Sequence, residues 1–277
     1  MRFDVALNHG ISLEISSKII RNTPFPTASI AKGWLLLNDG KDLSEEAVGF
    51  GVPIVKRGLQ AIFPGEIELF LGGGVDQCKF SARYTLNLVE KINHSTSPIN
   101  SRLITSTKNI LAGMIRQFPG LRRQLTGVSN QMRDRFGWQT VYEPAGFSAH
   151  VTMHYTINPK SGSLEVELID KQLSPEQVSE IIVMNEQGAH YFDSYWSDDG
   201  FSQRGAEIGC WDEVSTAWAE FTSDSEKLSF SLHQVEGAKL FCGRELVGDR
   251  LAWSGFGYSF SPRLERFKYQ VMLRKLL

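Results

Sequence analysis

Residues 150–168 read HVTMHYTINPKSGSLEVEL, and this stretch decides the fold. Apolar and polar residues alternate before the segment NPKSG at 158–162, and they alternate again after it. Alternation with a period of two is typical of a strand that buries one face, and a segment rich in Asn, Pro and Gly is typical of a turn. The stretch therefore predicts a β-hairpin.

The hairpin would place a pair of titratable residues opposite each other. Matching the apolar faces of the two strands gives the pairs Ile157–Leu164 and Tyr155–Val166. The same register places His154 opposite Glu167, and a cross-strand imidazole and carboxylate can serve as an acid–base pair. The alternative is that both residues lie on a solvated face. Because His150 and His154 would be about 13 Å apart on a strand, their spacing predicts no metal site.

Strand patterns extend over most of the remaining chain. Alternating apolar residues, or short apolar runs bounded by turn signals, predict the further strands. They cover residues 3–7, 11–15, 34–37, 52–55, 59–63, 66–71, 80–89, 228–232 and 267–273. Closely spaced strands with short turns favour antiparallel pairing. We predict a mainly β fold, a large antiparallel two-sheet β-sandwich, with a closed β-barrel as the alternative.

Residues 102–136 have a helical pattern instead. Apolar residues recur there at steps of three and four on both sides of Pro119-Gly120, which predicts two helices with a break. The segment carries seven basic residues against one acid, a local charge of +6, whereas the whole chain has a net charge of −2. We therefore predict a single β domain over residues 1–277 with a helical insertion at about 102–136.

Three arginines of this insertion are candidate ligand-binding residues. Arg122 and Arg133 fall together on the side of the predicted helices that is away from the apolar stripe. With Arg116 they would form a cleft wall for an anionic ligand, because a guanidinium binds carboxylates and phosphates through paired hydrogen bonds. Two alternatives are that the arginines balance the acidic β region, or that they dock an anionic membrane surface or acidic partner.

A short helix is predicted after the hairpin. Residues 174–177, SPEQ, have the pattern of a helix start, with Ser as the N-cap, Pro in the first position and Gln in the third. Val178, Ile181 and Ile182 would then face inward. Gly188 would end the helix.

Residues 190–211, HYFDSYWSDDGFSQRGAEIGCW, combine aromatic, acidic and basic side chains in a loop-like stretch. Aromatic rings stack on the apolar faces of sugars, while carboxylates and guanidinium groups bind sugar hydroxyls. The predicted catalytic residues are His190, Tyr191 and Arg204. The predicted substrate-binding residues are His154, Glu167, Asp193, Trp196, Arg116, Arg122 and Arg133. The alternative is that the rings belong to the core and that residues 197–200 form only a turn.

Composition and motifs exclude several classes of protein. The hydrophobic share of 42% and charged share of 22% are typical of soluble globular proteins, and a net charge near zero gives no reason to expect nucleic-acid binding. No Cys pair, phosphate-binding loop, dinucleotide pattern or G-x-S-x-G is present, so we expect no cofactor. No apolar run reaches about 18 residues and no signal-peptide pattern is found, so we expect no membrane span and a cytoplasmic location.

The sequence predicts a carbohydrate-binding or carbohydrate-active protein that acts on an anionic sugar or polyuronate. In a lyase-type mechanism, Arg204 would neutralise the uronate carboxylate while Tyr191 or His190 takes the α-proton. The alternative is a non-catalytic β-module that binds a small or apolar ligand or a protein partner. Whether catalysis occurs, and the oligomeric state, are left open.

Overall fold

The computed structural model describes residues 2–7, 10–17, 33–58, 60–71, 78–95, 138–174, 176–247 and 251–276. Within these ranges the chain forms β-strands and one turn of 3-10 helix, η3 (Gly205–Glu207). The high content of β-branched and aromatic residues favours strands, because such side chains pack well on a pleated surface. No helix in this part of the chain is long and apolar enough to cross a membrane.

The chain divides into two compact units, residues Met1–Leu88 together with Gly146–Leu277, and residues Val89–Ala145. The predicted helical insertion at 102–136 lies outside the described residues. Its three candidate residues, Arg116, Arg122 and Arg133, therefore stay predictions. The organisation of the chain as a single domain with an insertion also stays a prediction.

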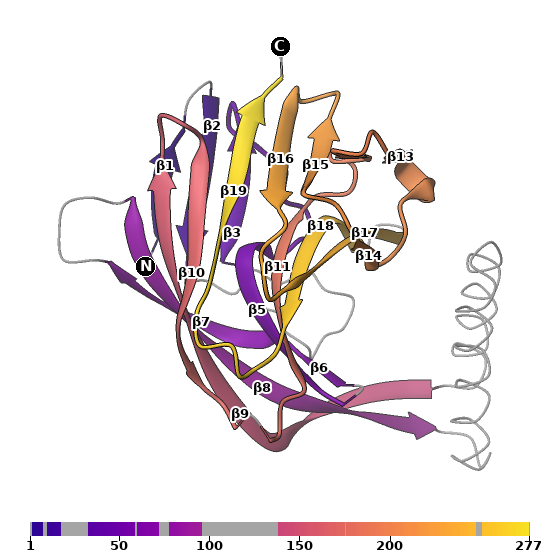
Figure 1. Cartoon of the computed structure of the whole chain (residues 1–277). Coiled ribbons are helices and arrows are strands. Elements are labelled where there is room, and N and C mark those ends of the chain that lie inside the picture. Colours follow the sequence, from indigo (N-terminus) through magenta and orange to yellow (C-terminus); the bar gives the residue numbers. More distant parts are fainter. Residues whose placement is uncertain are drawn as a thin grey trace. The chain divides into compact units, whose positions relative to one another are not determined.

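The strands form three antiparallel sheets, and none of them closes into a barrel in the described residues (Figure 1). A four-stranded sheet has the order β1 (Arg2–Ala6), β2 (Ile11–Ser16), β3 (Trp34–Asn38) and β4 (Lys41–Asp42). A nine-stranded sheet has the order β13 (Ser202–Arg204), β12 (Ser194–Ser197), β15 (Trp218–Ser223), β16 (Leu228–His233), β19 (Phe267–Lys275), β10 (Ser163–Gln172), β9 (Trp138–Asn158), β8 (Lys79–Ser95) and β7 (Pro64–Leu71). A six-stranded sheet has the order β14 (Asp212–Val214), β17 (Lys239–Val247), β18 (Leu251–Phe260), β11 (Glu180–Gln187), β5 (Gly49–Arg57) and β6 (Gln60–Ile62).

Aromatic side chains join the nine-stranded sheet to the other two sheets. Ring centroids lie 5.9 Å apart for Phe50 and Phe230, 4.9 Å for Phe256 and Phe221, 4.7 Å for Tyr258 and Tyr269, and 5.0 Å for Trp34 and Tyr155. In each pair the second ring comes from the nine-stranded sheet. The core therefore lies between two layers, as in a β-sandwich, and the predicted mainly β, antiparallel sandwich is confirmed.

The core also contains a network of buried hydrogen bonds. The carboxamide oxygen of Asn185, on β11, accepts from the amide of Gly51 at 3.1 Å and from the hydroxyl of Tyr269 at 2.8 Å. The hydroxyl of Tyr155 donates to the carbonyl of Gly51 at 2.8 Å and lies 2.7 Å from the hydroxyl of Tyr84. Gly51 has φ of 70°, and a Cβ there would lie 2.7 Å from the Tyr155 ring. The network thus needs a glycine at this place.

Strands β9 and β10 form the hairpin predicted from residues 150–168. The predicted register is confirmed, with the pairs Ile157–Leu164, Tyr155–Val166 and His154–Glu167. On β8, Ser81 contacts the Nδ1 of His154 at 3.1 Å, and Thr85 contacts the Nδ1 of His150 at 3.2 Å. Each imidazole therefore has a separate polar partner, in line with the strand spacing that argues against a shared metal ion.

The helix predicted from residue 174 onward is wrong. Glu180–Gln187 is strand β11, which lies between β18 and β5 near the middle of the six-stranded sheet. The predicted helix start forms only a turn, in which the amides of Gln177 and Val178 donate to the carbonyl of Ser174. Strand β11 is buried on both faces along most of its length. Its apolar run therefore lacks the alternation that identifies a half-buried strand.

Candidate functional site

Charged side chains from separate parts of the chain meet where β11 ends. We call them the Arg244 cluster, which consists of Glu45, His190, Asp193, Arg204, Asp224 and Arg244. One group is the ion pair of His190 and Glu45, and the other joins Arg204 to Asp193 and Asp224. Arg244 interacts electrostatically with Glu45 of the first group and with Asp193 of the second. The structure therefore brings together three residues that the sequence predicts for the site, His190, Asp193 and Arg204.

His190 and Glu45 form the first pair of the cluster. The Nδ1 of His190 lies 2.6 Å from one carboxylate oxygen of Glu45, and the backbone amide of His190 donates to the other at 3.1 Å. The imidazole side chain is more than half exposed. An exposed imidazole that is oriented by a carboxylate can exchange a proton with a bound ligand.

The segment 43–48 positions Glu45 against the end of β11. The amide of Gly188 donates to the carbonyl of Leu43 at 2.9 Å, and a Cβ at Gly188 would lie 2.6 Å from the Cγ of Glu45. The amide of Val48 donates to the carboxylate of Glu186 at 3.3 Å. The segment is therefore held at both ends by β11 and the residue that follows it.

Glu186 is a buried carboxyl group that supports this segment. Its burial raises its pKa to about 7. The hydrogen bond from Val48 lowers the pKa, and the nearby carboxylate of Glu245 raises it further. Glu186 is 5% exposed, so it acts on the site through the position of segment 43–48 and not by direct contact.

Arg244 connects the two ion-paired groups of the cluster. It lies on β17, and its Nη2 donates to the carbonyl of Ala189 at 2.9 Å. Partial burial lowers the pKa of the Arg244 guanidinium, and the carboxylates of Asp193 and Glu45 counteract that effect. The Nε of Arg244 is buried and has no hydrogen-bond partner among the described residues. A buried donor without a partner costs about 1–3 kcal/mol.

Gln187 lies on the same face of the six-stranded sheet as Arg244, with β18 between them. Both residues are register partners of Ser254 on β18, so the three side chains form one row across β11, β18 and β17. Gln187 is 0% exposed, and in the described part of the chain neither its carboxamide oxygen nor its nitrogen has a hydrogen-bond partner. Ser254 donates to the carbonyl of Phe192 at 2.7 Å. Gln187 and Arg244 thus carry buried polar atoms that the described residues leave without a hydrogen bond.

Arg204 forms the exposed end of the second group of the cluster. Its Nε lies 3.4 Å from the carboxylate of Asp193, and its Nη2 lies 3.1 Å from that of Asp224. Its backbone amide donates to the side chain of Glu207 at 3.2 Å, at the start of η3. These contacts hold the Arg204 guanidinium beside Asp193.

The other predicted site residues that the structure describes are not members of the Arg244 cluster. The ring of Tyr191 is covered by the ammonium group of Lys41, 4.7 Å from the ring centroid. Trp196 lies on β12 with 47% of its surface exposed. His154 and Glu167 face each other on β9 and β10. Within the described ranges, no group of three or more His, Cys, Asp and Glu residues is placed to hold a metal ion.

Four residues of the site were not predicted from the sequence: Glu45, Gln187, Asp224 and Arg244. Glu45 lies 145 residues before His190, and Arg244 lies 55 residues after Ala189. Gln187 belongs to a segment whose sequence pattern predicts a helix but which forms strand β11. The pairing of distant strands brings these residues together, and no local pattern in the sequence marks them.

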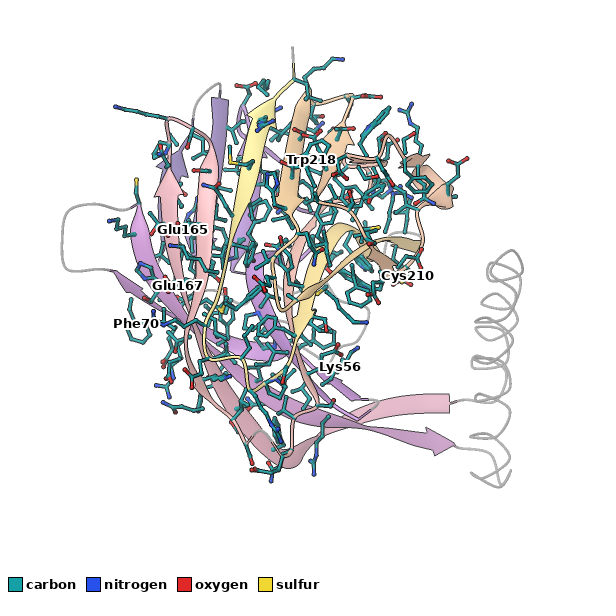
Figure 2. The ribbon with its side chains drawn as sticks, viewed as in Figure 1. Lys56, Phe70, Glu165, Glu167, Cys210 and Trp218 are labelled. Atoms are coloured by element: carbon teal, nitrogen blue, oxygen red, sulfur yellow. The ribbon has the colours of Figure 1, made fainter. Side chains whose placement is uncertain are left out.

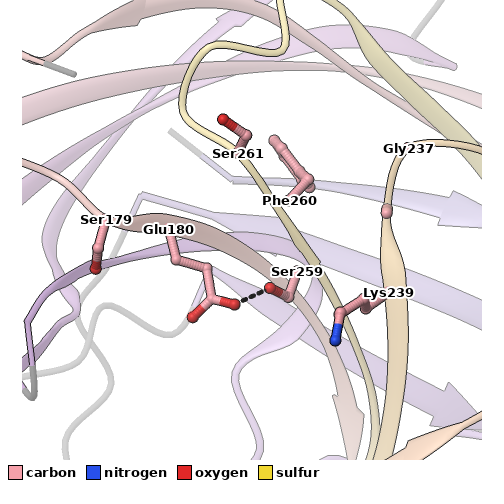
Figure 3. Close-up of a pocket in the computed structure, with 8 residues that line it drawn as sticks. Ser179, Glu180, Gly237, Lys239, Ser259, Phe260 and Ser261 are labelled. Atoms are coloured by element: carbon pink, nitrogen blue, oxygen red, sulfur yellow. Dashed lines mark hydrogen bonds between the residues drawn. The ribbon is translucent and has the colours of Figure 1, made fainter.

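A separate shallow pocket of about 490 Å³ lies on the six-stranded sheet, between Ser179-Glu180, Gly237–Lys239 and Ser259–Ser261 (Figure 3). Glu180 accepts a hydrogen bond from Ser259 and pairs with Lys56 at 2.7 Å, while Lys239 pairs with Glu213 at 3.0 Å. Burial acts to raise the pKa of Glu180, but the bonds from Lys56 and Ser259 outweigh it and lower the pKa. Glu180, Lys56 and Lys239 therefore each have an oppositely charged partner within the protein.

Comparisons with known proteins give similarity to solved structures alone. No protein-family model matches the chain, and no curated protein sequence does. The chain is similar to the α-N-acetylgalactosaminidase NagBb of Bifidobacterium bifidum in complex with GalNAc, with 11% sequence identity and a TM-score of 0.47. The match covers 99% of this chain but only 35% of the length of NagBb. It is also similar to a galactose mutarotase-like protein of Lactobacillus casei, with 7% identity and a TM-score of 0.44 over 99% of each chain. At these values neither structure supports a function for this chain.

Proposed function

We propose that the protein binds a sugar at the Arg244 cluster. The observation that carries the proposal is that the carboxamide of Gln187 and the Nε of Arg244 have no hydrogen-bond partner in the described residues, while Arg244 lies near the partly exposed carboxylates of Glu45 and Asp193. A sugar hydroxyl both donates and accepts hydrogen bonds. Arg244 and the carboxamide nitrogen of Gln187 supply donors, while Glu45 and Asp193 supply acceptors. Such a mixed set suits a polyhydroxylated ligand better than an apolar one.

The charge of the cluster favours a neutral sugar over an acidic one. Two guanidinium groups, from Arg204 and Arg244, lie among three carboxylates, from Glu45, Asp193 and Asp224. The acidic sugar or polyuronate predicted from the sequence is the second candidate. The observation in its favour is the partly buried guanidinium of Arg244, because a carboxylate forms strong paired hydrogen bonds with such a group.

The experiment is a titration of the purified protein with neutral and acidic monosaccharides, followed by calorimetry and saturation-transfer NMR. We expect binding of at least one neutral sugar, and we expect Arg244→Met to weaken it by about tenfold, or about 1.4 kcal/mol. Arg263→Met removes an exposed arginine from another surface and is the matched control. Arg244→Lys keeps the charge but loses the Nε donor, so it should also weaken binding.

Three results would count against the proposal in different ways. Equal binding by wild type and both Arg244 variants, with the fold intact by circular dichroism, would contradict a site at this cluster. Binding of acidic sugars alone would favour the second candidate. A thermal shift with apolar ligands and none with sugars would favour the non-catalytic β-module predicted as the alternative. The catalytic roles predicted for His190, Tyr191 and Arg204 stay predictions, and turnover of a bound sugar would test them.

A further inference from the structure

An exposed aromatic surface lies on the outer face of the nine-stranded sheet, next to the Arg244 cluster. On β12 and β15 the side chains of Tyr195 and Phe221 are fully buried in the core. Strand side chains alternate between faces, so Trp196 and Trp218 point outward, and Figure 2 shows Trp218 at this place. Trp196 is 47% exposed, whereas the ring of Phe201 packs 6.3 Å from the buried ring of Tyr195 and so lies on the opposite face. Large aromatic side chains are seldom this exposed without a partner.

Hydrogen bonds hold this surface in place before any ligand binds. The hydroxyl of Ser197 donates to the carboxylate of Asp199 at 2.5 Å, and the amide of Phe201 donates to the same oxygen at 3.0 Å. The hydroxyl of Thr216 donates to the carboxylate of Asp198 and contacts the carbonyl of Trp218 at 2.9 Å. The turn and the two flanking strands are therefore fixed, and binding on them costs little ordering entropy.

Polar groups surround the aromatic rings on the same face. Glu220 is the register partner of Trp196, and Ser231 on β16 is the register partner of Glu220. Ser231 and its neighbour Ser229 are buried, and their hydroxyls have no partner in the described residues. Of these groups, the carboxylate of Glu220 is the one that a ligand on the exposed face could reach, and a carboxylate beside a tryptophan can bind sugar hydroxyls while the ring stacks on the sugar.

Arg204 joins this surface to the proposed binding site. Its register partner is Ser194, so its side chain leaves the sheet on the same face as Trp196. It is also a member of the Arg244 cluster through its ion pair with Asp193. Arg204 thus links the face that carries Trp196 to the Arg244 cluster.

We propose that Trp196 and Trp218 form a platform for the body of an oligosaccharide, one end of which binds at the Arg244 cluster. This inference rests on the proposed function and adds the substrate class: a sugar chain and not a free monosaccharide. The rings stack on successive sugar units, and Glu220 and Arg204 bond their hydroxyls. The platform adds affinity only for ligands long enough to reach it.

The test measures affinity against chain length. Wild-type protein is titrated with a monosaccharide that binds and with its di-, tri- and tetrasaccharides. We expect affinity to rise with length, and we expect Trp196→Ala to weaken binding of the longest chain by about tenfold while monosaccharide binding is unchanged. Phe70→Ala is the matched control, because Phe70 is 49% exposed on β7, at the opposite edge of the same sheet.

The outcomes separate this inference from the proposed function. Absence of binding of any monosaccharide and of any chain would overturn both. Monosaccharide binding that Arg244→Met weakens, with no gain from chain length or no effect of Trp196→Ala, would overturn the platform alone. Self-association of the wild type that Trp196→Ala abolishes, without an effect on sugar binding, would show a protein interface and would also overturn the platform. Trp196→Phe keeps a ring and should retain most of the length-dependent gain.

Discussion

Asn185 and Gln187 lie two residues apart on the same face of β11, and both are 0% exposed. The carboxamide oxygen of Asn185 accepts two hydrogen bonds from the core, from Gly51 and Tyr269. The carboxamide of Gln187 has no partner in the part of the chain that the structure describes. The difference separates a buried amide that the fold satisfies from one that it leaves without a hydrogen bond in the described residues. Asn185 therefore belongs to the architecture, and Gln187 to the candidate site.

The largest effect expected is the loss of stability on replacing Asn185. Asn185→Leu leaves the amide of Gly51 and the hydroxyl of Tyr269 without their acceptor in the core. Each unsatisfied buried group costs about 1–3 kcal/mol, so we expect a loss of about 4 kcal/mol. Urea denaturation measures it. A loss below about 1 kcal/mol would mean that the core satisfies these groups in another way.

The second prediction concerns Glu186, which lies between the two amides and on the opposite face of β11. Burial raises the pKa of Glu186 to about 7 in the folded protein, against 4.5 for the unperturbed group. Folding thus takes up a proton, and the stability that this group contributes is full below pH 4.5 and is lost as the pH rises through about 7. Glu186→Gln should therefore be more stable than wild type at pH 8 by about 3 kcal/mol, and nearly equal to it at pH 4.5.

Denaturation curves at several pH values test this prediction. Glu236→Gln, which makes the same substitution at an exposed position, is the control. The difference between Glu186→Gln and wild type should grow between the two pH limits. A constant difference would show that Glu186 titrates alike in the folded and unfolded chains.

The smallest effect on stability is expected for Gln187→Met, which removes the carboxamide but keeps the length of the side chain. Because the described protein offers this group no hydrogen bond, and an unsatisfied buried group costs about 1–3 kcal/mol, we expect no loss in the free energy of unfolding and a gain of about 1 kcal/mol. Sugar binding, measured by calorimetry, should weaken by several-fold. A large loss of stability would place Gln187 in the same class as Asn185 and would remove the contrast between them.

The sequence predicts most of the fold because its strands carry a clear period. The hairpin of β9 and β10 was predicted to the correct register, since the alternation on both strands and the Asn-Pro…Gly turn agree. Strand β11 was mistaken for a helix. It is buried on both faces, and a short apolar run after a helix-start pattern does not distinguish the two structures.

The candidate site was predicted only where its residues are close in the sequence. Asp193 and Arg204 lie in one aromatic and charged stretch, and the structure joins them in an ion pair. Glu45 and Arg244 are distant from that stretch and have ordinary neighbours in the sequence. They reach the site because the segment before β5 packs on Gly188 and because β17 pairs with β18. Contacts between residues that are far apart in the sequence leave no periodic pattern in the sequence around them.

The hydrogen bonds of Asn185 have a consequence for how the chain finds its fold. A shift of β11 by one residue relative to β5 and β18 would move Asn185 out of the core and bring the ionisable Glu186 into it. Both changes are costly, because Gly51 and Tyr269 would lose their acceptor and a carboxyl group would face the aromatic core. A central strand rich in apolar residues on both faces offers little else to distinguish neighbouring alignments. The hydrogen bonds of Asn185 therefore help to fix the register of β11 in the six-stranded sheet.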